Sequence, residues 1–290
     1  MDSYSTKPSD FELVRYTDPE SFRRVCLPWL LEAEDVNNTL LGMIDLMAEG
    51  SSVYRHPFFL GTLVQSSQIV GCCAFALPDG LLVSDMPKLA ARILFQGFTH
   101  TIGVPKRIAG PPEIADLFAS SWRSRKPTLT TELTVWSIWR VDGIPENRGP
   151  AKGLLRLGVS SDEQLVTKWG QSYGEEKSHA PIDVGSFMLR KLRRKELYVW
   201  EDSGPATIVT LSGRTENSVK ISAVYTPAEK RGAGYATKAV AELVKQEILA
   251  GRKFLTLVTD DADNHLDRMY RRLGFERVGT RHSYAIDLTA

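Results

Sequence analysis

The chain of 290 residues contains 42% hydrophobic and 24% charged residues, a composition typical of a folded protein with a sizeable core. Its length exceeds that of a typical domain of about 100–200 residues and therefore predicts two compact units. The 36 Lys and Arg residues against 35 Asp and Glu leave a net charge of +1, which excludes a broad positive field for nucleic acid or an anionic membrane.

Targeting segments and metal sites are not indicated by the sequence. Residues 1–14 lack the basic and then apolar order of a secretory signal, and no run of about 18 apolar residues is available to cross a bilayer. We therefore expect a cytoplasmic protein without membrane contact. Cys26, Cys72 and Cys73 fit neither a disulfide framework nor a zinc site, and we interpret them as buried, reduced thiols. The five histidines show no H-x-x-x-H spacing, so no metal is expected.

Apolar periodicity predicts a similar order of elements in each half of the chain. In the first half it predicts two strands within residues 59–77, a strand at 81–84, helices at 88–100 and 114–123, and a strand at 133–141. In the second half it predicts helices at 165–173 and 186–192, strands at 196–200, 206–211 and 218–225, a helix at 235–250, a strand at 254–259, a helix at 264–273 and a strand at 282–288. The recurrence predicts an α+β fold built by tandem duplication.

A linker is predicted at residues 141–153 (VDGIPENRGPAKG), where two prolines and three glycines interrupt the periodic pattern. The predicted domains are accordingly residues 1–145 and 154–290.

The stretch at residues 221–240 (ISAVYTPAEKRGAGYATKAV) predicts a strand, a glycine-containing turn and a helix. Pro227 cannot donate to a sheet ladder and ends the strand. Gly232 and Gly234 let a phosphate approach the backbone, and the free amides of the first helical turn point toward it. Arg231 adds positive charge and a fork of donors. The pattern is typical of a turn that binds a pyrophosphate, although a glycine pair before a helix also occurs for purely geometric reasons.

Two common nucleotide-binding motifs do not fit this turn. A P-loop requires Lys and then Ser or Thr directly after its last glycine, whereas Tyr235 and Ala236 follow Gly234. A dinucleotide-binding turn requires a third glycine and a βαβ unit, whereas the preceding strands are predicted to be hairpins.

The turn resembles the acyl-coenzyme A signature [RQ]-x-x-G-x-[GA] of the GNAT superfamily of N-acetyltransferases. Arg231, Gly234 and Ala236 fill its defined positions, and residues 270–275 (YRRLGF) resemble that superfamily's Y-x-x-L-G-F segment. The resemblance covers residues 154–290. It implies a GNAT-like fold, with acetyl-CoA as the co-substrate and no metal.

The resemblance also implies a site. The pantetheine arm is expected to lie beside Val224, Tyr225 and Thr226, and a backbone amide near Tyr225 or Thr226 is the expected oxyanion donor. Asp263 occupies a position at which family members often carry a pantetheine-binding Asn, and Leu266 stands where a small residue is usual. The resemblance thus implies that Arg231, Gly232, Ala233, Gly234, Tyr235, Ala236 and Thr237 hold the pyrophosphate and that Asp263 contacts the cofactor, whereas we interpret Leu266 as a core residue of its helix.

Catalytic roles follow from the same resemblance and from elementary chemistry. Tyr270 is the expected general acid, because a phenol is protonated at neutral pH and can donate to a departing thiolate. Glu176 is the first choice for the general base and Asp260 the second.

The first half is predicted to be a degenerate GNAT-like repeat. Its counterpart of the phosphate-binding turn, residues 82–90 (LVSDMPKLA), has no glycine pair and no arginine, and Asp85 would repel phosphate. Residues 114–123 likewise lack the tyrosine and the Leu-Gly-Phe turn.

The predicted function is direct transfer of an acetyl group from acetyl-CoA to an amine of a small molecule or peptide. The alternative is a non-catalytic acyl-CoA sensor or interaction protein. Aminoacyl transfer from a charged RNA is disfavoured by the net charge of +1. The sequence leaves open the acceptor amine, the acyl group and the oligomeric state.

Overall fold

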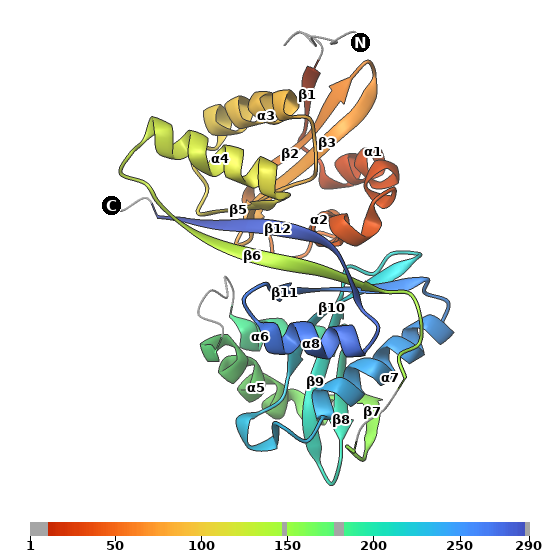
Figure 1. Ribbon diagram of the computed structural model, residues 1–290. Helices are drawn as coiled ribbons and strands as arrows, with labels where there is room; N and C mark the ends of the chain where they lie inside the picture. Colours follow the sequence, from red (N-terminus) through yellow and green to blue (C-terminus); the bar gives the residue numbers. More distant parts are fainter. Residues whose placement is uncertain (1–10, 147–149, 177–182, 288–290) are drawn as a thin grey trace. The chain divides into compact units, whose positions relative to one another are not determined.

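The structure is a computed structural model that describes residues 11–146, 150–176 and 183–287 (Figure 1). The chain forms two compact units, one made by residues up to Ser137 together with those from Gly279 onward, and one made by Ile138–Val278. Parts of three sequence predictions lie outside the described residues: the absence of a signal at residues 1–10, positions 147–149 of the linker, and position 288 of the last strand.

Each half of the chain contains the same succession of strands and helices. The first half contains β1 (Phe11–Tyr16), α1 (Pro19–Leu31), α2 (Glu34–Ala48), β2 (Arg55–Gln65), β3 (Gln68–Leu77), β4 (Gly80–Val83), α3 (Lys88–Thr101), β5 (Arg107–Gly110), α4 (Pro112–Arg125) and β6 (Thr130–Val141). The second half contains β7 (Leu154–Leu157), α5 (Glu163–Glu176), α6 (Val184–Arg193), β8 (Leu197–Glu201), β9 (Pro205–Ser212), β10 (Ser218–Tyr225), α7 (Tyr235–Leu249), β11 (Phe254–Asp260), α8 (Asn264–Arg272) and β12 (Glu276–Asp287). The predicted α+β fold with two similar halves is confirmed.

The sheet in each unit is antiparallel except for one parallel pair. In the first unit β1 to β4 pair antiparallel in succession, and β4 pairs parallel with β5. In the second unit β7 to β10 pair antiparallel in succession, and β10 pairs parallel with β11. A parallel pair requires a crossover, which α3 provides in the first unit and α7 in the second.

The final strand of the chain belongs to the first unit. β12 pairs antiparallel with β5, with His282 opposite Gly110. The Tyr284 hydroxyl donates to the Asp116 carboxylate of α4 at 2.9 Å, and a ring nitrogen of His282 lies 2.6 Å from the same oxygen. The sequence-based boundaries instead counted this strand with the second half, because periodicity shows that a strand exists and not which neighbour it pairs with.

The cores of the second unit lie on the two faces of its sheet. One core packs the sheet against α7 and α8, and includes Val240, Leu243 and Tyr270. The other packs the sheet against α5 and α6, and includes Trp169 and Met188. Below, these are the α7/α8 face and the α5/α6 face. The separation matters because the candidate site draws residues from both.

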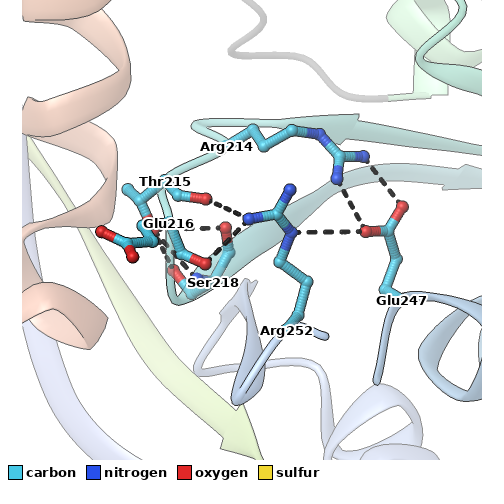
Figure 2. Close-up of polar contacts among 6 residues, drawn as sticks. All are labelled: Arg214, Thr215, Glu216, Ser218, Glu247 and Arg252. Atoms are coloured by element: carbon cyan, nitrogen blue, oxygen red, sulfur yellow. Dashed lines mark hydrogen bonds and ion pairs between the residues drawn. The ribbon is translucent and has the colours of Figure 1, made fainter. Parts of the chain in front are cut away.

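An ionic network secures the far end of α7 (Figure 2). Two nitrogens of Arg214 donate to the two carboxylate oxygens of the buried Glu247 at 2.8 Å each. Arg252 approaches the same carboxylate at 3.8 Å and donates to the backbone carbonyls of Thr215 and Glu216 at 2.5 and 2.8 Å. The network ties the connection before β10 to the end of α7, and so holds the crossover that carries the candidate turn.

The three cysteines are buried and free, as predicted. Burial is the main cause of the raised pKa values of the Cys72 and Cys73 thiols, which disfavours the reactive thiolate form. None of the described helices is long and apolar enough to cross a membrane.

Candidate cofactor and active site

Strands β10 and β11 separate toward their carboxyl ends. Their parallel pairing runs from Ser218 opposite Phe254 to Ile221 opposite Leu257 and stops there, although β10 continues to Tyr225. On its other side β10 remains paired with β9 as far as Tyr225. Beyond Ile221, the edge of β10 that faces β11 therefore has no strand partner among the described residues. The backbone amides and carbonyls along that edge are open to a ligand.

A β-bulge at Ser222 changes which face the following side chains cover. The register with β9 shifts between Ile221 and Ala223. Without a shift, strict alternation would place Ile221 and Ala223 on the same face. Instead Ile221 packs on the α7/α8 face, whereas Ala223 and Tyr225 pack on the α5/α6 face. The bulge thus directs Tyr225 toward α5.

Aromatic side chains of α5 surround Tyr225. The Trp169 and Tyr173 rings meet the Tyr225 ring edge to face, with centroid distances of 6.1 and 5.8 Å. The α5 segment therefore packs against the end of β10. Edge-to-face packing of this kind fixes ring orientation and adds about 0.5–1.5 kcal/mol beyond area burial.

The predicted glycine turn has the geometry of an anion cradle. Gly232 and Gly234 have φ of 81° and 85°, in the left-handed region that favours glycine. A Cβ on Gly232 would meet no described atom within 4 Å, and one on Gly234 would meet only the Ala151 Cβ at 4.0 Å. Gly234 is the N-cap of α7, where no described side chain caps the helix, so the first amides stay free for an anion.

Three contacts hold the turn against the hairpin of β8 and β9. The Tyr235 hydroxyl donates to the Asp202 carboxylate at 2.9 Å, and the Lys230 ammonium donates to the Pro205 carbonyl at 2.8 Å. The Thr226 hydroxyl bonds to the Thr207 hydroxyl. The hydroxyls of Tyr235 and Thr226 are thus engaged within the protein.

Arg231 is already engaged on two sides. Its Nε donates to the Thr226 carbonyl at 2.9 Å, and one terminal nitrogen donates to both carboxylate oxygens of Glu176 at 2.6 and 2.7 Å. The guanidinium also lies 5.9 Å from the centre of the Tyr225 ring. The Glu176 carboxylate raises the pKa of Arg231 above its usual value. The two residues predicted for cofactor binding and for base catalysis therefore form an ion pair with each other.

Tyr270, on α8, lies on the α7/α8 face of the sheet. The side chain is buried and packs edge to face on Phe275 at 5.4 Å. Burial raises its pKa above the usual value for tyrosine, and Tyr173 and Asp263 add smaller contributions. Tyr173 belongs to the core on the opposite face of the sheet.

The remaining carboxylates are engaged in local backbone contacts. Asp263 is the N-cap of α8, and its side chain accepts from the His265 and Leu266 amides at 3.1 Å each. Asp260, at the end of β11, accepts from the Ala262 amide at 3.0 Å. Asp263 thus has a structural role that explains its presence without any ligand.

Several residues of the site have no signal in the sequence. Asp202, Pro205 and Thr207 reach the turn from 19 or more residues away, and only the folded hairpin brings them together. No group of three or more His, Cys, Asp or Glu side chains among the described residues is arranged to hold a metal.

Comparison with known proteins agrees with this duplicated α+β architecture. Residues 211–285 match the family model described as FR47-like protein. No curated protein matches the sequence. A tandem GNAT protein from the clavulanic acid biosynthesis pathway is 11% identical, with a TM-score of 0.55 over 96% of this chain and 98% of that chain. A GCN5-related N-acetyltransferase from Sphaerobacter thermophilus is 12% identical, with a TM-score of 0.61 over 97% and 96%.

A Drosophila protein is similar over 96% of this chain and 99% of that chain, with 10% identity and a TM-score of 0.69. At these identities the matches show the fold. The fold is similar to that of a tandem GNAT protein, and the resemblance to the GNAT superfamily predicted from residues 231–236 and 270–275 is confirmed at the level of the fold.

Proposed function

We propose that this protein is an N-acyltransferase that transfers an acetyl group from acetyl-CoA to an amine of a small molecule or peptide. The proposal rests on the observation that a free strand edge and a glycine turn follow directly on each other in the chain. The unpaired edge of β10 leads directly into a glycine turn with free helix amides. An extended chain that ends in a pyrophosphate matches this shape and polarity.

The residues present fit such a co-substrate. The backbone amides of Gly232 to Thr237 would hold the pyrophosphate, because both glycines leave open space above the turn. Val224, Tyr225 and Thr226 would bond the pantetheine amides along the free strand edge. The bound co-substrate supplies an activated acyl group as a thioester.

Tyr270 is the proposed general acid. Burial raises the pKa of its phenol, so the hydroxyl stays protonated throughout the physiological range. A protonated phenol can donate to the leaving thiolate. The amides at the free edge near Tyr225 and Thr226 can stabilise the oxyanion that forms when an amine attacks.

The acceptor amine would approach past α5, where Trp169 and Tyr173 pack around Tyr225. The general base remains a prediction. Glu176 has both oxygens bound by Arg231, and Asp260 accepts one local backbone amide.

Release of free thiol from acetyl-CoA tests the proposal. The protein is incubated with acetyl-CoA and, separately, with amino acids, aliphatic and aromatic amines, and peptides with free N-termini or lysines. Thiol release should require both the protein and one class of amine, and mass spectrometry should find that amine acetylated. Binding of CoA without release by any amine would instead support the non-catalytic alternative.

A further inference from the structure

The Glu176–Arg231 pair joins two segments that are 55 residues apart in the sequence. Both oxygens of the carboxylate accept from one terminal nitrogen of the guanidinium, and the Arg231 Nε is bound by the Thr226 carbonyl. Arg231 is thereby held at the mouth of the glycine turn with its charge neutralised by a carboxylate.

A pyrophosphate in the turn would need the same guanidinium. Anions are the preferred partners of the arginine fork, and a carboxylate and a phosphate compete for the same donors. The side chains of Arg231 and Glu176 are 48% and 44% exposed, so the pair is weak enough for a ligand to replace.

We infer that Glu176 is a counter-ion that competes with the co-substrate pyrophosphate for Arg231, and that it is not the general base. This inference rests on the proposed function of the turn. In the empty protein Glu176 neutralises Arg231 and fastens the last turn of α5 to the turn before α7. When pyrophosphate binds, Arg231 exchanges its carboxylate partner for a phosphate. The affinity of Arg231 for either anion is lowered by the presence of the other.

The position of Glu176 on α5 extends this competition to the acceptor side. Tyr173, one helical turn earlier on α5, packs on Tyr225 at 5.8 Å. Tyr225 in turn lies beneath the Arg231 guanidinium. Filling of the phosphate turn therefore changes the contacts of the helix that borders the proposed acceptor approach.

The experiment measures CoA affinity by calorimetry for the full chain and for Glu176→Gln, which keeps the shape of the side chain and removes its charge. Glu175→Gln is the matched control, because Glu175 is the exposed neighbouring glutamate on the same helix. We expect Glu176→Gln to tighten CoA binding about two- to fivefold, the size expected for an exposed ion pair, and Glu175→Gln to leave it unchanged.

A double-mutant cycle with Arg231→Gln shows whether the effect passes through the arginine. In that background Glu176→Gln should change the CoA dissociation constant by less than twofold. A full gain in affinity that persists without Arg231 would mean simple charge repulsion and would overturn the competition. Weaker binding in Glu176→Gln would overturn it as well, since Glu176 would then hold Arg231 in its binding pose.

Kinetics separate this role from base catalysis. If Glu176 is a counter-ion, Glu176→Gln should lower the KM for acetyl-CoA and leave the fall in kcat at acidic pH unchanged. A general base predicts loss of kcat by about 10² or more together with loss of that acidic fall, which would overturn the inference. Failure of wild-type protein to bind CoA would refute the proposed function itself, and is distinguishable from each of these results.

Discussion

The crossovers β4–α3–β5 and β10–α7–β11 occupy equivalent places in the two units but differ where the helix begins. In the first unit the ends of the parallel strands are in close contact, because a Cβ on Gly110 would lie 2.3 Å from the Val83 Cγ2 and 2.9 Å from its carbonyl oxygen. In the second unit β10 and β11 separate after Ile221, and Gly232 and Gly234 border open space.

The connection before α3 is filled by its own side chains. The Ser84 hydroxyl accepts from the Cys72 amide at 2.8 Å and donates to the Asp85 carbonyl at 2.9 Å. Met86 is buried, and a Cβ on Gly71 would meet its Cβ at 2.7 Å. Pro87 precedes the helix. A crossover thus keeps its path when its helix start changes, and the glycines and the strand separation distinguish the candidate anion site of the second unit.

The largest expected effect concerns Tyr270 of the second unit, in which β10 and β11 separate. Tyr270→Phe keeps the ring and its packing on Phe275 and removes one hydroxyl. We expect kcat to fall by about 10²–10⁴ while the CoA dissociation constant stays within a few-fold. Because burial raises the pKa of Tyr270, the wild-type enzyme should retain this acid up to at least about pH 10.

Tyr284→Phe is the matched control for that variant, since Tyr284 is a buried tyrosine of the first unit whose hydroxyl bonds to Asp116. Steady-state kinetics of both variants measure the contrast. A changed KM with nearly unchanged kcat in Tyr270→Phe would assign the tyrosine to packing alone.

Breaking the ionic network of Figure 2 should destabilise the second unit. Glu247→Gln leaves Arg214 and Arg252 facing each other without the buried carboxylate between them. We expect the free energy of unfolding to fall by about 1–3 kcal/mol, less than for a fully buried pair because the Arg214 side chain is 40% exposed. Glu242→Gln, on the same helix with only a 3.5 Å pair to Lys245, should cost less than about 0.5 kcal/mol.

Chemical denaturation of both variants measures this difference, and equal losses would show that the network does not brace the helix. CoA affinity measured below the unfolding transition should be unchanged in both, because the network lies at the opposite end of α7 from the turn.

The glycine turn predicts a smaller, binding-specific effect. Gly234→Ala places a methyl group where a phosphate would approach, and its φ of 85° adds backbone strain. Gly251→Ala, at the other end of α7, has the same sign of φ and equally open surroundings. Both variants should lose about 1 kcal/mol of stability, and only Gly234→Ala should weaken CoA binding, by about tenfold or more. Equal CoA affinities in calorimetry would remove Gly234 from the site.

Local patterns in the sequence predicted most of this fold. Periodicity located β10 at its observed bounds and α7 to within one residue. The helix α7 is long and amphipathic, and Pro227 and Gly234 mark the end of the strand and the start of the helix. It did not locate β5 and β7, which are four residues long, or α1, which contains Pro28. Elements this short or interrupted carry too few apolar repeats to stand out.

The candidate site divides in the same way. The glycine-containing turn before α7 follows from the local sequence and was predicted, whereas its left-handed φ values are seen in the structure. The bulge at Ser222 and the Glu176–Arg231 pair depend on tertiary contacts and were not. Asp263 is instructive, because its position before α8 is a local N-cap signal that the family resemblance obscured.

The smallest expected effect is an absence of change in the first unit. Asp85 lies in the connection before α3, where its side chain accepts from the Met86 amide at 3.0 Å and places negative charge at the helix start. If the first unit binds no CoA, Asp85→Asn should leave the CoA dissociation constant within about twofold, and calorimetry should find one site per chain in both proteins. Loss of that charge weakens one local contact and creates neither the glycines nor the strand separation that an anion needs. Two equivalent sites in the wild-type protein, or a second site gained in Asp85→Asn, would mean that the filled strand ends at Val83 and Gly110 do not prevent binding, and the contrast between the two crossovers would lose its functional meaning.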